Sequence, residues 1–311
     1  MSRATNWAGN VSFGAKRLHQ PTSVEQLQEF VAGGKRIRAL GTGHSFNGIA
    51  DTTGDLISLQ DLPATIELDP RRGSVTVAAG VRYGELAQRL HAGNRALPNL
   101  GSLPHISVAG ACATGTHGSG DTNGNLATAV SAMDLVTASG ESVTLSRDVY
   151  ADAFCGAVVG LGCVGIVTHL TLDTVPAFDI AQYVYDDLPA EQLTDDFETL
   201  FSSAYSVSVF TDWRGQDINQ VWLKQRTDAA NGWEPEPHWR GATLADGGRH
   251  PVPGMSPIHC TQQGGVPGPW HERLPHFRLH FTPSSGNELQ SEYLLPRQAA
   301  ADAISALYSL G

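Results

Sequence analysis

Alternating apolar and polar positions divide the first half of the chain into short strands and two clear helices. Residues 21–34 predict a helix that Thr22 or Ser23 can cap and that a Gly-Gly pair ends. Residues 82–94 predict a second helix, since their apolar residues recur near the helical period. Strand patterns with β-branched residues cover 35–41, 55–59, 65–69 and 73–81.

A second group of elements follows a long segment of small residues. Residues 96–125 carry no extended amphipathic pattern, and a loop of this length in a compact domain is usually functional. Residues 130–146 then predict two strands joined by a turn at Ser139-Gly140. Residues 152–176 predict a glycine-interrupted helix that runs into a strand.

The composition of the sequence changes near Pro176, after which aromatic residues become commoner. Residues 205–213 and 218–226 predict antiparallel strands. Residues 227–275 predict a long ordered excursion, and residues 286–311 predict a last strand and a final helix beginning near Pro296. We therefore expect an α+β protein with one domain over 1–176 and a second, built on an antiparallel sheet, over 177–311.

The amino-acid composition limits the classes of molecule that this protein could bind. The formal net charge of −11 argues against a nucleic-acid binder, which usually carries a basic stripe, and against attraction to anionic membranes. The 16% of charged residues lies below the roughly 25% of a typical soluble protein. The 34 glycines indicate many tight turns or close approaches of backbone to a ligand.

The sequence favours a cytoplasmic protein. It contains no apolar run of about 18 residues and no apolar core of a secretory signal near its start. The four cysteines form no C-x-x-C pair, so we expect them to be reduced and mostly buried.

Two glycine-rich stretches, "GTGHSFNG" at 41–48 and "SVAGACATGTHGSG" at 107–120, carry the candidate chemistry. His44, His105 and His117 are possible metal ligands, but no acidic residue sits close by in sequence to complete a site, so we predict no metal. Loop histidines bonded to backbone are the plainer alternative. Glycines and hydroxyls on two separate loops suit an elongated dinucleotide pyrophosphate, although neither a P-loop nor a Rossmann fingerprint occurs.

These stretches also carry a family resemblance. Residues 41–47, 98–119 and 160–167 resemble the FAD-binding domain (PCMH type) of the vanillyl-alcohol oxidase flavoprotein superfamily. The second half resembles the bacterial alditol oxidases within it, through "YSVSVFTDWR", "VWLK", "HPVPGM", "GVPGPWHERLPHF" and "FTPSSGNELQSEYLLPR". The resemblance covers nearly the whole chain.

The resemblance implies a set of flavin-binding residues. His44 corresponds to the histidine that is bonded covalently to the 8-methyl carbon of the flavin in this family, a bond expected to raise the flavin's reduction potential. Gly162 and Ile166 correspond to the segment along the adenosine part. The full set implied to bind FAD is Gly41, Thr42, Gly43, His44, Ser45, Phe46, Asn47, Ser102, Ser107, Gly110, Thr114, Gly115, Thr116, His117, Gly162 and Ile166.

The resemblance also implies a reaction. FAD would oxidise the terminal hydroxyl of an alditol such as xylitol or sorbitol to an aldose, and O₂ would be reduced to H₂O₂. Ser102 corresponds to a serine that faces flavin and substrate, and Gly101 lies where the family controls oxygen access. We expect a monomer whose partners are a polyol and O₂.

The pattern breaks at the end of the chain. Alditol oxidases continue into a strand with a Glu-x-Arg pair, a histidine and a lysine near the flavin, whereas this sequence ends at "ISALYSLG". We therefore expect the substrate domain to be incomplete and the catalytic base to lie beyond residue 311. A sugar-lactone oxidase, a non-catalytic flavin-binding fragment and, from another class, a zinc hydrolase remain as alternatives.

Overall fold

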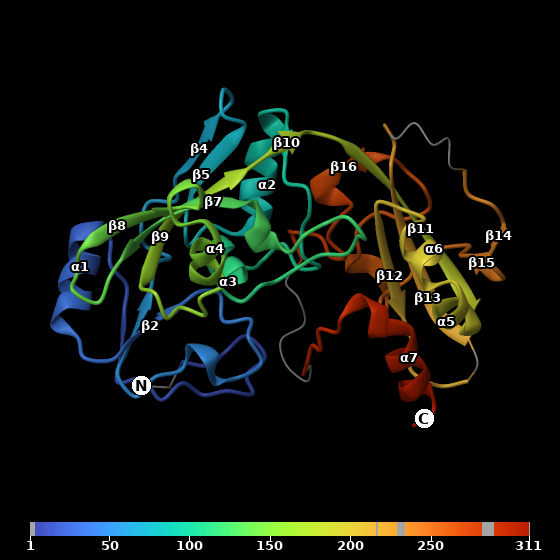
Figure 1. Cartoon of the computed structure of the whole chain (residues 1–311), viewed down its shortest axis with the longest axis horizontal. Coiled ribbons are helices and arrows are strands. Elements are labelled where there is room, and N and C mark those ends of the chain that lie inside the picture. Colours follow the sequence, from blue (N-terminus) through green and yellow to red (C-terminus); the bar gives the residue numbers. More distant parts are fainter. Residues whose placement is uncertain (1–3, 216, 229–233, 282–288, 311) are drawn as a thin grey trace.

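The computed structural model describes residues 4–215, 217–228, 234–281 and 289–310. Two lobes lie side by side, the first built from the N-terminal half and the second from the C-terminal half (Figure 1). The chain passes from one to the other between β10 (Val175–Pro176) and β11 (Asp179–Pro189). β10 still pairs with β6 (Arg95–Ala96) of the first lobe, whereas β11 forms the centre of the second.

A small parallel sheet opens the first lobe. Its strand order is β1-β3-β2, with the bounds β1 (Arg17–His19), β2 (Ile37–Leu40) and β3 (Asp55–Ser58). The crossover between β1 and β2 is α1 (Val24–Gly33), which Ser23 caps by accepting the amide hydrogen of Gln26 at 3.2 Å. The buried face of α1, Leu27 and Val31, packs against the neighbouring sheets. β2 is thereby fixed as the strand that leads into residues 41–48.

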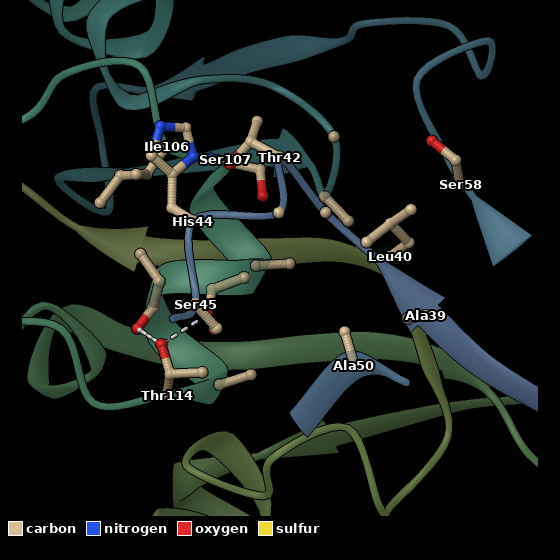
Figure 2. Close-up of a pocket in the computed structure, with 18 of the residues that line it drawn as sticks. Ala39, Leu40, Thr42, His44, Ser45, Ala50, Ser58, Ile106, Ser107 and Thr114 are labelled. Atoms are coloured by element: carbon tan, nitrogen blue, oxygen red, sulfur yellow. Dashed lines mark hydrogen bonds between the residues drawn. The ribbon is translucent and has the colours of Figure 1, made fainter. Parts of the chain in front are cut away.

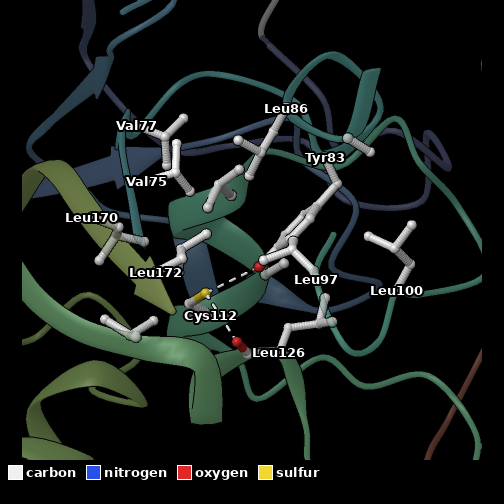
Figure 3. Packing of buried hydrophobic residues seen from close by; sticks show 14 of the residues in the cluster. Val75, Val77, Tyr83, Leu86, Leu97, Leu100, Cys112, Leu126, Leu170 and Leu172 are labelled. Carbon is white, nitrogen blue, oxygen red and sulfur yellow. Dashed lines mark hydrogen bonds between the residues drawn. The ribbon is translucent and has the colours of Figure 1, made fainter. Parts of the chain in front are cut away.

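A five-stranded antiparallel sheet forms the body of the first lobe. Its order is β4-β5-β9-β7-β8, and the bounds are β4 (Ile66–Asp69), β5 (Ser74–Ala78), β7 (Val130–Val136), β8 (Ser142–Ser146) and β9 (Ile166–Asp173). Three helices lie in the same lobe: α2 (Tyr83–Ala92), α3 (Val108–Ala113) and α4 (Arg147–Val158). Alternate β5 and β9 side chains pack against α2 and α3 in the largest core, where Tyr83 contacts the Cys112 thiol at 3.2 Å (Figure 3).

The second lobe is an antiparallel sheet with the order β12-β13-β11-β15-β14, and β16 pairs with the start of β11. The bounds are β12 (Ser206–Phe210), β13 (Asp217–Arg226), β14 (His238–Trp239), β15 (Ala242–Leu244) and β16 (Gly268–Pro269). Helices α5 (Glu191–Asp195), α6 (Phe197–Phe201) and α7 (Ala300–Tyr308) accompany it. Phe178, Ile180, Trp270 and Leu274 of this half join the large core of the first lobe, so the lobes share packed surface.

Several sequence predictions are confirmed and others are wrong. The helices expected at 21–34 and 82–94 and the strand pair at 130–146 form as predicted. The stretch 96–125 is not all loop, since it contains α3, whose small residues hide any amphipathic pattern. In the described part of 286–311 a helix forms but no strand does. Cys112 and Cys260 are buried, but Cys155 and Cys163 are exposed, which corrects the expectation that most would be buried.

Within the described ranges, every helix is too short or too polar to cross a bilayer.

The second lobe contains a buried lysine, Lys224 on β13. Its ammonium nitrogen Nζ donates a hydrogen bond to the carbonyl of Leu274.

Candidate functional site

A cavity of about 710 Å³ opens where the two glycine-rich stretches meet. Its walls come from the end of β2, residues 41–47, the turn after β5, α3 and the turn at 161–162. Residues 279–281 close it from the C-terminal half. A space of this size is suited to a cofactor rather than to a single ion.

The loop after β2 is held in place by the N-terminal segment. The Trp7 amide donates to the Gly43 carbonyl at 2.8 Å, and the Asn6 side chain donates to the Ser45 carbonyl at 3.0 Å. Gly43 has a φ of +72°, in the left-handed region where glycine carries no Cβ penalty. This turn directs the following side chain, His44, into the cavity (Figure 2).

His44 is oriented by two neighbours. Its Nδ1 lies 3.0 Å from the Thr42 hydroxyl, and its ring stacks on Trp7 with centroids 5.1 Å apart and planes 17° from parallel. Its Nε2 is buried and has no hydrogen-bond partner among the described residues. A buried polar atom without a partner is costly, so this nitrogen is suited to bonding with a bound group.

Burial, assisted by the nearby His105 and Arg82, lowers the pKa of His44 from 6.5 to about 4. The imidazole is therefore neutral at pH 7, and one ring nitrogen keeps its lone pair. A neutral imidazole can act as a nucleophile, whereas an imidazolium cannot.

The two glycine-rich stretches contact each other at Ser107. The Ser107 amide donates to the Thr42 hydroxyl at 3.3 Å. A Cβ added at Gly41 would come within 2.7 Å of the Ser107 hydroxyl oxygen, and one at Gly110 within 2.8 Å. A side chain at either position would therefore displace the Ser107 hydroxyl. The amides of Val108 and Ala109 donate to the carbonyls of the turn after β5, so these two are not free to bind a phosphate.

The charge of the cavity is opposite to that of the chain. Arg38 and Arg82 line it, and none of the described residues that line it is an Asp or Glu. In a chain of net charge −11 this is a local excess of positive charge. A ligand that carries phosphates is favoured here by simple electrostatics.

The structure brings together eleven of the predicted residues around the cavity. They are Gly41, Thr42, Gly43, His44, Ser45, Asn47, Ser107, Gly110, Thr114, Thr116 and Gly162. Phe46, Gly101, Ser102, Gly115, His117 and Ile166 do not line it. The Ile166 side chain belongs to the core beneath α1, and Phe46 packs edge-on against Trp7 at 6.1 Å.

Ser102 and His117 face the C-terminal half instead. The carbonyl of Ser102 accepts hydrogen bonds from the amides of His276 and Phe277 at 3.1 and 3.2 Å. His117 bonds to the Glu292 carboxylate at 2.5 Å. Partial burial lowers the pKa of His117, but the Gly118 carbonyl and Glu292 outweigh it and raise the pKa above its usual value.

Several residues that line the cavity could not be predicted from the sequence around them. Trp7, Arg38 and Arg82 lie outside any glycine-rich motif, and Leu279 and Phe281 come from the other half of the chain. His105 shares the cavity, with its Nε2 at 2.7 Å from the Leu279 carbonyl. Among the described residues, no three His, Cys, Asp or Glu side chains gather in a way that could hold a metal ion.

Comparisons with known proteins agree with this geometry. The family described as "FAD binding domain" matches residues 15–146. Alditol oxidase from Streptomyces sp. is 54% identical over 307 residues, which is 97% of this chain and 72% of that enzyme. L-gulonolactone oxidase from Bos taurus is 34% identical over 64% of this chain, and the match spans 46% of that enzyme.

A solved structure supports the fold alone. Cholesterol oxidase from Brevibacterium sterolicum, as its His121Ala mutant, has a TM-score of 0.61 at 16% identity and covers 72% of this chain. From these similarities and from the site, the chain belongs to the alditol oxidase family, within the FAD-binding flavoproteins of the vanillyl-alcohol oxidase superfamily.

Proposed function

We propose that this protein binds FAD in the cavity, covalently through His44, and oxidises the terminal hydroxyl of alditols such as xylitol or sorbitol to aldoses with O₂ as acceptor. The observation that carries the proposal is the buried, neutral His44 nitrogen, which has no hydrogen-bond partner in the described part of the chain. It lies at a cavity that, among those residues, two arginines and no carboxylate line. The 54% identity to a Streptomyces alditol oxidase supports the substrate class.

The residues present fit FAD by three independent features. The glycines at 41 and 110 leave room that a Cβ would fill, beside the Ser107 hydroxyl. Arg38 and Arg82 supply positive charge that suits a diphosphate. The orphaned Nε2 of His44 supplies the nucleophile. FAD, when bound, supplies the electron acceptor for the alcohol and the route of electrons to O₂.

The chain's own residues prepare the attachment. The Thr42 hydroxyl holds the His44 ring by its Nδ1 and is itself held by the Ser107 amide. Trp7 covers one face of the ring, and the Nε2 of His44 is buried. The ring is therefore held in place and unprotonated, as a nucleophile requires.

Residues outside the cavity belong to the proposal as well. Ser102 is exposed at the junction of the two halves, a position consistent with contact to substrate, and buried Gly101 precedes it. A Cβ on Gly101 would lie 3.5 Å from Thr116 Cγ2, in ordinary contact. We propose that Ser102 contacts the polyol, that Gly101 leaves a path for O₂, and that the protein is a cytoplasmic monomer.

The test of the cofactor uses His44→Ala. The unsubstituted protein is expected to show flavin fluorescence on a denaturing gel, and the His44→Ala protein is expected to release its flavin on acid denaturation. Thr42→Val keeps the nucleophile but removes the hydroxyl that holds its ring, and it is expected to lower covalent incorporation without abolishing it. Flavin fluorescence retained on the gel by His44→Ala would contradict the covalent assignment.

The test of the substrate measures H₂O₂ in air with xylitol, sorbitol and L-gulono-1,4-lactone. Peroxide with the alditols and not with the lactone supports the proposed reaction, and the reverse order supports a lactone oxidase. Yellow protein that forms no peroxide supports the flavin-binding alternative. Colourless protein that binds no flavin contradicts the proposal altogether.

A further inference from the structure

Arg38 is a cation of the cavity without a carboxylate partner. It lies on β2, is half-buried, and takes part in no ion pair among the described residues. Its Nη1 donates to the Leu161 carbonyl at 3.1 Å and lies 3.6 Å from the Cys163 sulfur. These contacts use one of its three nitrogens, which leaves the donors of Nε and Nη2 for a ligand.

The turn that Arg38 touches is shaped to present a carbonyl to it. Leu161 and Gly162 have φ values of +51° and +72°, two left-handed residues in succession. The Leu161 amide donates to the Ala113 carbonyl at 3.1 Å, which ties the turn to the end of α3. One side of the Arg38 guanidinium is thus fixed against the protein, so that its position in the cavity wall is defined.

Arg38 and His44 line different parts of the cavity. The Arg38 guanidinium contacts the turn at Leu161 and Cys163, whereas the His44 ring stacks on Trp7. Ala39, which follows Arg38 on β2, lies away from His44 (Figure 2). Under the proposed function, His44 holds the flavin end of FAD. An elongated dinucleotide fixed there extends its AMP half away from His44, and we place that half beside the contact between Arg38 and the turn at 161–162, which also lines the cavity.

We propose that Arg38 binds the AMP half of FAD and makes the site selective for FAD over FMN. The inference rests on the proposed flavin site and assigns a residue outside the two glycine-rich stretches to cofactor choice. Its physical basis is a charge-assisted contact from a guanidinium that lines the cavity and whose printed contacts within the protein use Nη1 alone.

Reversible binding makes the assignment measurable. In a His44→Ala background, the dissociation constants of FAD and FMN are obtained from quenching of flavin fluorescence, and that of ADP from calorimetry. Adding Arg38→Ala is expected to raise the dissociation constants of FAD and ADP by about ten- to a hundredfold, the range of one charged hydrogen bond. The dissociation constant of FMN is expected to rise by less than about twofold. Arg38→Lys is expected to recover part of the loss.

Arg36→Ala is the matched control. Arg36 lies two residues earlier, is exposed, and donates to the Thr53 hydroxyl at 3.1 Å without lining the cavity. Its loss is expected to leave all three dissociation constants unchanged.

Two results would overturn the assignment. Unchanged binding of FAD and ADP in Arg38→Ala removes the role altogether. Equally weakened binding of FMN, FAD and ADP, together with a lower midpoint of urea unfolding, shows that Arg38 merely holds the turn at 161–163. A His44→Ala parent that binds neither FAD nor ADP instead contradicts the flavin site itself, so the two failures are distinguishable.

Discussion

Lys224 provides the sharpest test of the energetics. Its side chain is 1% exposed, and its Nζ donates to the Leu274 carbonyl. Burial lowers its pKa from 10.5 to about 7, although nearby Cys260 acts in the opposite direction. No carboxylate lies in an ion pair with it among the described residues, and its neighbour His276 is also buried, with a pKa well below its usual value.

The sign of the pH dependence follows from proton counting. Between pH 7 and pH 10.5 the unfolded chain keeps a proton on Lys224 that the folded chain has lost. The free energy of unfolding therefore rises with pH in this window and is lowest below pH 7, where the folded protein must bury the charge. The full slope is about 1.4 kcal/mol per pH unit, and the rise from pH 7 to pH 9 is about 2 kcal/mol after partial titration.

Lys224→Met isolates this contribution. The methionine keeps the apolar volume, removes the titrating group, and leaves the Leu274 carbonyl without its donor at a cost of about 1–3 kcal/mol that does not depend on pH. The free energy of unfolding is measured with urea at pH 7, 8 and 9. From pH 7 to pH 9 that of the unsubstituted protein is expected to rise by about 2 kcal/mol more than that of the variant. Exposed Lys16→Met is the control and is expected to give parallel curves.

Parallel curves for Lys224→Met would refute the reasoning. A difference in unfolding free energy that stays constant within about 0.5 kcal/mol from pH 7 to pH 9 would mean that the buried amine keeps its ordinary pKa.

Two further predictions concern the loop at 41–47. Gly43→Ala is expected to lower the free energy of unfolding by about 1–2 kcal/mol, since alanine is strained at a φ of +72°, and urea titration measures the loss. The same variant should incorporate less covalent flavin, because His44 is displaced; normal incorporation would contradict this. The low pKa of His44, about 4, predicts that apo-protein forms the covalent adduct with FAD equally fast from pH 6 to pH 8. Gel fluorescence over time measures that rate, and a steep rise through pH 6.5 would show an ordinary histidine.

The sequence alone identified both stretches that form the main part of the site. "GTGHSF" and "SVAGACATGTHGSG" are dense in glycine where chain segments pack closely, as at Gly41 and Gly110 beside the Ser107 hydroxyl, and that composition is visible without a structure. The strands of the first lobe were visible for a similar reason, since their alternation reflects one buried face. The helix at 108–113 was missed because Ala, Gly and Cys leave no polar face to mark a period.

The tertiary structure decided which distant residues complete the cavity. Trp7 stacks on His44 across 37 positions of sequence, and Arg38 reaches Leu161 across 123. The neighbouring sequence does not identify these residues, because the pattern around an arginine on a strand is the same whether its side chain faces solvent or a ligand. Residues 41–47 and 107–116 thus indicated a cofactor site from the sequence alone. The orphaned His44 nitrogen and a cavity to which the described residues contribute no carboxylate exist only after packing brings distant segments together.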